Sequence, residues 1–144
     1  MVAITVLMAV YNPPLGMLDE AIDSILGQTF PDFEFLILDD GSTDPGTAPH
    51  LRTRAQADAR VRIAWEPHRG LTATLNRGLG LASGEFIARQ DADDWSAPTR
   101  FARQLAHFAA HPSDAVCGSN ALTHQQDGRA LWPTRLPQIG RAHV

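Results

Sequence analysis

Three apolar segments of the sequence each end in side chains that could bind a metal ion or a phosphorylated ligand. These side chains are Tyr11 and Asn12 after residues 4–10, Asp39 and Asp40 after residues 33–38, and Asp91 and Asp93 after residues 85–88. In an open α/β sheet, ligands bind at the carboxyl ends of the strands. If the segments are neighbouring parallel strands, these side chains meet at one edge of the sheet.

Asp91 and Asp93 form a D-x-D pair. Carboxylates held close together repel one another unless a positive charge neutralises them. Mg²⁺ or Mn²⁺, which prefers oxygen ligands, would do this and would also contact substrate phosphates. The alternative is an acidic surface turn in which an aspartate caps the following helix. The position of the pair after an apolar strand leaves both interpretations open.

The other candidate residues also have two interpretations each. Asp39 and Asp40 could accept hydrogen bonds from a nucleobase or a ribose, or could belong to an ordinary turn with Gly41 and Ser42. Tyr11 could stack on a base, or could be a half-buried aromatic residue at a strand end. Arg69 could pair with a diphosphate, or could be a solvated charge in a loop.

Other features of the sequence exclude several classes of site. No G-x-G-x-x-G follows residues 4–10, which argues against a dinucleotide-binding domain. The chain contains no Lys, so it has no P-loop. His107 and His111 have the spacing of a chelating pair, but no acidic partner is evident, and we expect them to be surface residues. Cys117 lies in an apolar segment and is expected to be an inert core thiol.

Composition sets the class of protein. The 144 residues are 44% hydrophobic and 19% charged with a net charge of −4, as in a soluble domain without general affinity for nucleic acid. A single cysteine excludes an internal disulfide and fits a reducing compartment. The apolar start of the chain lacks the features of a signal peptide, and no apolar run is long enough to span a bilayer. We therefore expect a cytoplasmic protein.

Apolar patterns and turn residues predict alternating strands and helices. Strands are expected at residues 4–10, 33–38, 61–65 and 85–88, with a fifth beginning at 115–118, and helices at 15–26, 47–57, 71–82 and 98–111. A turn is expected at 126–129. This order predicts an α/β fold, a mostly parallel sheet with helices on both faces.

These motifs, in this order and spacing, resemble the family 2 glycosyltransferases with the Rossmann-like GT-A fold, particularly bacterial enzymes of cell-surface polysaccharide synthesis. The resemblance covers nearly all of residues 3–122. The matching stretches are residues 5–12, 24–30, 36–44, 70–71, 75–79, 82–89 and 91–94.

The resemblance implies a function and a role for each residue. The protein would transfer a sugar from a nucleotide-sugar donor, expected to be UDP-linked, to a hydroxyl of a glycan or lipid-linked acceptor, with inversion and with Mg²⁺ or Mn²⁺. Its site residues would be Tyr11 against the base, Asp40 bonded to the base with Asp39 close by, Asp91 beside the ribose, and Asp93 on the metal. Arg69 is adjacent to the position where a basic residue near the phosphates is expected.

The resemblance also implies that the chain is incomplete at its C-terminus, so that residues 1–138 would be a partial GT-A domain. Because the chain ends without a predicted closing helix or strand, residues 139–144 are expected to be a non-native tail. The missing part would supply the general base, so the fragment alone would be inactive, and any association with the inner face of the membrane would depend on that part. A non-catalytic nucleotide-binding module is the alternative. A sugar-phosphate nucleotidyltransferase is disfavoured, because residues 11–16 are not a glycine-rich basic loop.

Overall fold

The computed structural model describes residues 2–124 and 130–134, which form two compact units divided after Thr99. The positions of the two units relative to one another are not determined, so each unit is described by itself. Among the described residues, no helix combines the length and the apolar character that crossing a membrane requires.

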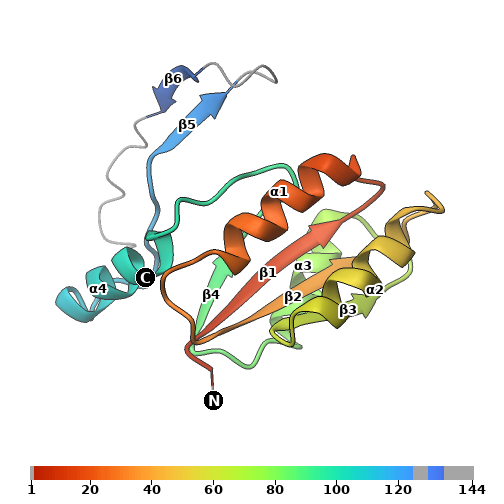
Figure 1. Cartoon of the computed structure of the whole chain (residues 1–144). Coiled ribbons are helices and arrows are strands. Elements are labelled where there is room, and N and C mark those ends of the chain that lie inside the picture. Colours follow the sequence, from red (N-terminus) through yellow and green to blue (C-terminus); the bar gives the residue numbers. More distant parts are fainter. Residues whose placement is uncertain (1, 125–129, 135–144) are drawn as a thin grey trace. The chain divides into compact units, whose positions relative to one another are not determined.

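The first unit is a parallel four-stranded sheet with three helices (Figure 1). The strand order is β3-β2-β1-β4, so that β1 lies in the middle between β2 and β4. The strands are β1 (Ile4–Val10), β2 (Phe33–Asp39), β3 (Val61–Trp65) and β4 (Phe86–Arg89), and the helices are α1 (Leu15–Leu26), α2 (Thr47–Ala57) and α3 (Leu71–Leu79).

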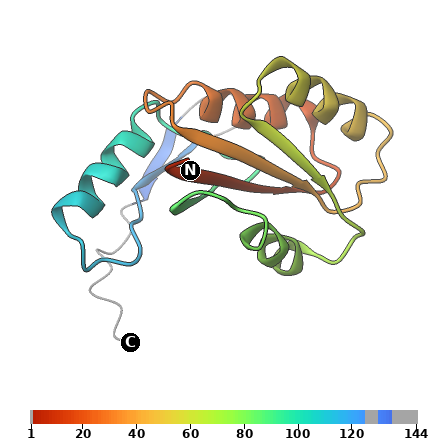
Figure 2. The same ribbon diagram turned by 90° about the horizontal axis from the view of Figure 1, so that it is seen from below.

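Helices cover both faces of this sheet (Figure 2). Helices α1 and α2 lie on one face and α3 lies on the other. Strands covered on both faces read as continuous apolar runs, and β2 is buried at every position. The predicted α/β fold, with a parallel sheet and helices on both faces, is therefore confirmed.

Helix α3 packs unusually close to the sheet at a glycine. Gly78 is buried, and a Cβ atom at this position would collide with the side chains of Leu7 and Leu38. These two leucines and Leu36 form a buried cluster, against which Leu75 of α3 packs. The missing side chain of Gly78 is thus what allows α3 to approach the two central strands.

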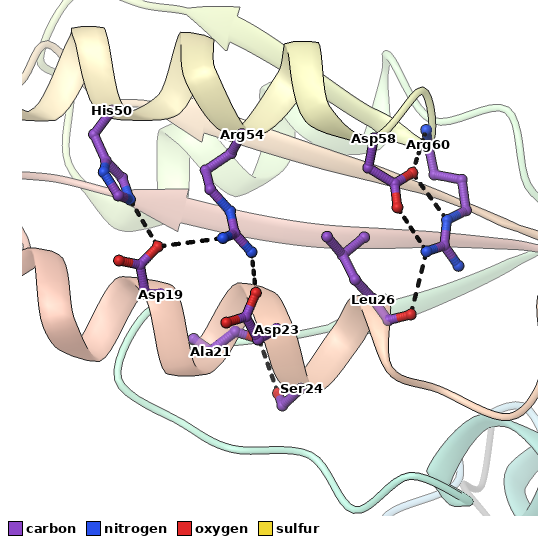
Figure 3. A network of polar contacts seen from close by, with 9 residues as sticks. All are labelled: Asp19, Ala21, Asp23, Ser24, Leu26, His50, Arg54, Asp58 and Arg60. Carbon is purple, nitrogen blue, oxygen red and sulfur yellow. Dashed lines mark hydrogen bonds and ion pairs between the residues drawn. The ribbon is translucent and has the colours of Figure 1, made fainter.

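Helices α1 and α2 are joined by polar contacts across their shared side (Figure 3). His50 Nε2 of α2 lies 2.9 Å from Asp19 Oδ1 of α1. Arg54, one turn further along α2, pairs with both Asp19 and Asp23. Near the end of α1, Arg60 donates a hydrogen bond to the carbonyl oxygen of Leu26. These contacts fix how the two helices lie beside one another.

A buried carboxylate lies near the amino-terminal end of the sheet. Glu34 accepts hydrogen bonds from Thr5 and from the hydroxyl and backbone N–H of Ser83, and it pairs with Arg62 at 2.5 Å. Burial alone would raise the pKa of Glu34, but these hydrogen bonds lower it from 4.5 to about 2. The folded state therefore stabilises the ionised form of Glu34.

The second unit differs from the sequence prediction. Its elements are α4 (Arg100–Ala110) and the antiparallel pair β5 (Ala121–His124) and β6 (Ala130–Thr134). The predicted strand beginning at 115–118 is wrong, because this segment is irregular. The strand β5 begins at Ala121, six residues after the predicted start, and pairs with β6 instead of joining the parallel sheet. A short apolar run does not itself define a strand, and Val116 is 70% exposed.

The prediction for Cys117 is also wrong, because the residue is only half-buried and lies outside any strand. Its thiol is 3.7 Å from the carbonyl oxygen of Gly118. The predicted turn at 126–129 and the predicted tail at 139–144 lie outside the described residues.

Replacing Glu34 should change how stability depends on pH. Because the pKa of Glu34 is lower in the folded state, its contribution is complete above about pH 4.5 and is lost as the pH falls toward about 2. In urea denaturation, Glu34→Gln should lower the free energy of unfolding at pH 7 by up to about 3 kcal/mol and flatten its decline in this window. Glu20→Gln, on the exposed side of α1, is the control and should retain the decline.

Candidate functional site

The strand register brings three strand ends to one edge of the sheet. Val10 of β1 lies beside Asp39 of β2, and Leu7 of β1 lies beside Arg89 of β4. The pairing continues just past the strands, since the N–H of Asp40 donates to the carbonyl oxygen of Val10. The polar residues that follow these strands therefore lie on neighbouring segments of the backbone.

A pocket of about 360 Å³ opens at this edge. It is lined by residues 9–14, Leu71, Arg89 and residues 91–93. Three of the predicted site residues, Tyr11, Asp91 and Asp93, are thus part of one pocket wall although they are up to 82 positions apart in sequence, counted from Tyr11 to Asp93. Asp39, Asp40 and Arg69 do not line it.

Asp40 lies below the surface and is engaged by the chain itself. It is 3% exposed, and its carboxylate accepts hydrogen bonds from the N–H groups of Arg69 and Gly70 at 2.8 and 2.9 Å and from the Thr74 hydroxyl at 2.7 Å. The ring Nδ1 of His68 lies 2.9 Å from the same carboxylate. These contacts show Asp40 holding the start of α3, and the expected bond between Asp40 and a base stays a prediction.

These contacts also set the charge of Asp40. Burial by itself would raise its pKa, but the hydrogen bonds from Thr74, Arg69 and Gly70, together with the charge of His68, hold the pKa below its usual value. Gly70 has a φ of 87°, a conformation that suits glycine, and it stands directly before α3. The ionised Asp40 thus fixes the loop that leads into α3.

Asp39 and Arg69 occupy different surroundings. Asp39 is 5% exposed at the end of β2, and its Oδ1 accepts a hydrogen bond from the N–H of Ser42 at 3.2 Å. Arg69 is exposed, and its backbone N–H is the group bonded to Asp40. The structure therefore brings Asp39 to the site edge and leaves the Arg69 side chain in solvent.

Tyr11 and His68 form an aromatic pair above Asp40. Their ring centroids are 4.2 Å apart with an interplanar angle of 27°, which is a stacked arrangement. Tyr11 remains 47% exposed despite this contact. An exposed ring held by a second ring is a suitable platform for a planar ligand such as a nucleobase.

The acidic turn after β4 is shaped by buried amide contacts. Gln90 is 3% exposed, its Nε2 donates to the carbonyl oxygen of Asp94 at 2.7 Å, and its Oε1 accepts from the Ser96 hydroxyl at 2.7 Å. Asp91 pairs with Arg89 at 2.8 Å. Within residues 2–124 and 130–134, the exposed Asp93 carboxylate makes no hydrogen bond or ion pair, so its oxygens face solvent.

Asn12 connects the ends of β1 and β2. It has a φ of 46°, and its side-chain Oδ1 accepts hydrogen bonds from the N–H groups of Thr43 and Asp44 at 2.8 Å each. Its own N–H donates to the Ser42 hydroxyl at 2.9 Å. Asn tolerates positive φ better than most residues, which explains its position at this sharp bend.

Asn12 was among the candidate ligand-binding side chains at a strand end, but its contacts to the end of β2 were not predicted, and His68 and Arg89 were given no role. His68 and Arg89 could have been identified from their position at or after the end of a predicted strand, which is how Tyr11 and Asp91 were identified. The ring stacking and the Arg89–Asp91 pair depend on side-chain directions, which the spacing does not give.

Comparison with known proteins assigns the family. The model of glycosyl transferase family 2 matches residues 5–142, and the chain belongs to this family. EpsE of Bacillus subtilis, a protein assigned to the glycosyltransferases, is 34% identical over 126 residues, which are 87% of this chain and 45% of EpsE. The resemblance drawn from the motifs is thereby confirmed.

Solved structures give the same result for the fold. A mannosyltransferase from Pyrobaculum calidifontis, PcManGT in complex with GDP-Man and Mn²⁺, superposes with a TM-score of 0.70 at 29% identity, covering 78% of this chain and 34% of that protein. Residues 1–349 of S. aureus TarS in complex with UDP-GlcNAc give a TM-score of 0.69 at 26% identity and cover 78% and 32%. The chain thus has the GT-A fold and spans less than half the length of these relatives.

Removing the charge of Asp40 should destabilise the fold. In Asp40→Asn, the amide nitrogen would face at least one N–H or hydroxyl donor, and one buried donor would lose its acceptor. The free energy of unfolding, measured with urea, should fall by about 1–3 kcal/mol. Asp93→Asn, which replaces an exposed carboxylate, is the matched control and should stay within about 0.5 kcal/mol of the parent. An unchanged Asp40→Asn would contradict the role of Asp40 in holding the loop.

Proposed function

We propose that this chain forms the donor-binding part of a glycosyltransferase that transfers a sugar from a nucleotide-sugar to an acceptor hydroxyl. The observation that carries the proposal is the pocket at which the ends of the neighbouring parallel strands β1 and β4 bring together Tyr11, Asp91 and Asp93. Such a donor has a flat base at one end, which could stack on the aromatic ring, and a diphosphate at the other, which binds a divalent cation that the two carboxylates could hold.

The base would lie against Tyr11. His68 stacks on one side of this ring, so the base would use the exposed part of the platform. Asp39, at the end of β2, is the better placed of the two adjacent aspartates to accept a hydrogen bond from a base, because among the described residues its carboxylate accepts one hydrogen bond, from Ser42, whereas the carboxylate of Asp40 accepts three. Asp40 then acts by positioning the loop before α3.

The diphosphate end would lie near the acidic turn. Asp93 would ligate Mg²⁺ or Mn²⁺, since its carboxylate is exposed in the pocket and oxygen ligands suit both ions. When bound, the ion would neutralise the charge of the diphosphate leaving group. Asp91 would contact the ribose. Arg89, which lines the same pocket, would offer a positive charge to the phosphates, a role that the resemblance had placed near Arg69.

The reaction would be a direct displacement at the sugar's anomeric carbon. The acceptor hydroxyl oxygen forms a bond to this carbon as the bond to the diphosphate oxygen breaks, the hydroxyl proton passes to a general base, and the configuration is inverted. No described residue is assigned as that base. This chain's residues would bind and orient the donor, which keeps the reacting carbon in a fixed position.

The relatives indicate a setting for this activity. The donors in the two solved structures carry different bases, GDP-Man in one and UDP-GlcNAc in the other. We take UDP as the first donor nucleotide to test, and a glycan or lipid-linked acceptor of cell-surface polysaccharide synthesis as the partner, in the cytoplasm at the inner face of the membrane.

Calorimetric titration with UDP, with and without Mn²⁺, tests donor binding. The purified chain should bind UDP only when Mn²⁺ is present, and Asp93→Asn should weaken this binding at least about tenfold because a metal ligand is lost. Glu34→Gln, at the opposite end of the sheet, should bind as the parent does at pH 7, where its folded state is retained. Titrations with GDP and dTDP test the choice of base.

Two results would contradict the proposal. Metal-independent binding that Asp93→Asn leaves unchanged would favour a nucleotide-binding module without the proposed metal site. Absence of binding of all three nucleotides to a folded sample, as judged by circular dichroism, would show that the pocket does not hold a donor by itself.

A further inference from the structure

The second unit contains a cluster of three metal-ligand side chains at the end of α4. His107, His111 and Asp114 each offer one ligand atom, and these atoms all lie within 4.8 Å of one another. His107 and His111 were expected to be plain surface residues because no acidic partner was evident. The structure supplies that partner, since Asp114 Oδ2 is 2.9 Å from His107 Nε2.

Backbone contacts bring Asp114 back to the helix. The N–H of His111 donates to the carbonyl oxygen of His107 at 2.9 Å, which extends the last helical turn. The N–H of Asp114 then donates to the carbonyl oxygen of His111 at 3.0 Å, and this turn reverses the chain. Together they place the carboxylate beside the imidazoles through local structure alone.

A hydrogen bond fixes one nitrogen of the His111 ring. Its Nδ1 lies 3.1 Å from the carbonyl oxygen of His107, and because a carbonyl can only accept, Nδ1 donates this hydrogen bond. A histidine bound to a metal typically makes such a contact with its second ring nitrogen, and here Nε2 would be the nitrogen that binds the ion. The ring of His111 is also stacked on that of His107, with centroids 4.5 Å apart.

We propose that His107, His111 and Asp114 form a binding site for a divalent transition-metal ion of the zinc class. Two imidazoles and one carboxylate suit Zn²⁺, Ni²⁺ or Cu²⁺, whereas the all-oxygen site proposed at Asp93 suits Mg²⁺ or Mn²⁺. Ligand atoms on one such ion lie about 3.0–3.5 Å apart, because metal–ligand distances are about 2.0–2.2 Å. Binding would therefore bring the ligand atoms closer together and turn the rings of His107 and His111 out of their stacked arrangement, and the ion would replace the contact between His107 and Asp114.

The site is accessible, and water can complete the coordination. His111 is exposed, and the other two residues are half-buried. Bound metal would link the last turn of α4 to the segment that follows it, so that residues 111–114 are fixed on the helix end.

Zinc titration of the full chain, produced without a histidine tag, tests the proposal. Excess Mg²⁺ is included to occupy the oxygen site at Asp93. Calorimetry should show one equivalent of Zn²⁺ bound, and His107→Gln, His111→Gln and Asp114→Asn should each weaken that binding at least about tenfold. Circular dichroism checks that each variant is folded.

His50→Gln is the matched control. His50 also pairs with an aspartate at 2.9 Å, but among the residues that the structure describes, Asp19 and His50 are not part of a cluster with a second imidazole. This variant should bind Zn²⁺ with unchanged affinity. As a second readout, electron paramagnetic resonance of bound Cu²⁺ should show coupling to two imidazole nitrogens in the parent and to one in His111→Gln.

The proposal is overturned by any of three results. These are no one-to-one binding at millimolar Zn²⁺, affinity unchanged in one of the three cluster variants that is folded, or equal weakening in His50→Gln. The contact between His107 and Asp114 would then be a cap of the helix end without metal affinity.

Discussion

The buried charge of Asp40 is the constraint on which the rest of the site depends. A carboxylate that is 3% exposed is tolerated only if donors surround it, and the donors here come from the loop before α3 and from α3 itself. This requirement ties the end of β2 to a segment about 30 residues later, since the N–H of Gly70 is one of the donors. The same loop carries His68, which supports the ring of Tyr11. The ionised carboxylate of Asp40 thus holds both the start of α3 and, through His68, the ring of Tyr11.

Most of the first unit could be predicted from the sequence because its strands are buried on both faces. The apolar runs of β1 and β2 are continuous, and residues with turn preference end them. The second unit could not be predicted in the same way. Residues 115–118 are apolar but make no strand, since a short run lacks the periodicity that separates a strand from an irregular segment.

The candidate site was predictable in its location but only partly in its contacts. Strand ends are visible in the sequence, and the parallel order then brings Tyr11, Asp91 and Asp93 to one pocket. The spacing of residues in the sequence could not predict which side chains form hydrogen bonds or ion pairs with one another. In the sequence, Asp40 could not be distinguished from Asp39, yet its carboxylate is bonded to the loop before α3. Asp114 contacts His107 because two backbone hydrogen bonds at the end of α4 reverse the chain.

The order of the strands has a consequence for how the protein forms during synthesis. Ile4 lies beside Phe86 in the sheet, so about 80 further residues must be synthesised after β1 before it can pair with β4. Contacts between residues so distant in sequence close slowly, because a long loop of chain must first be ordered. The pocket wall at Asp91 follows β4 directly and is therefore among the last parts of the first unit to be completed as the chain leaves the ribosome.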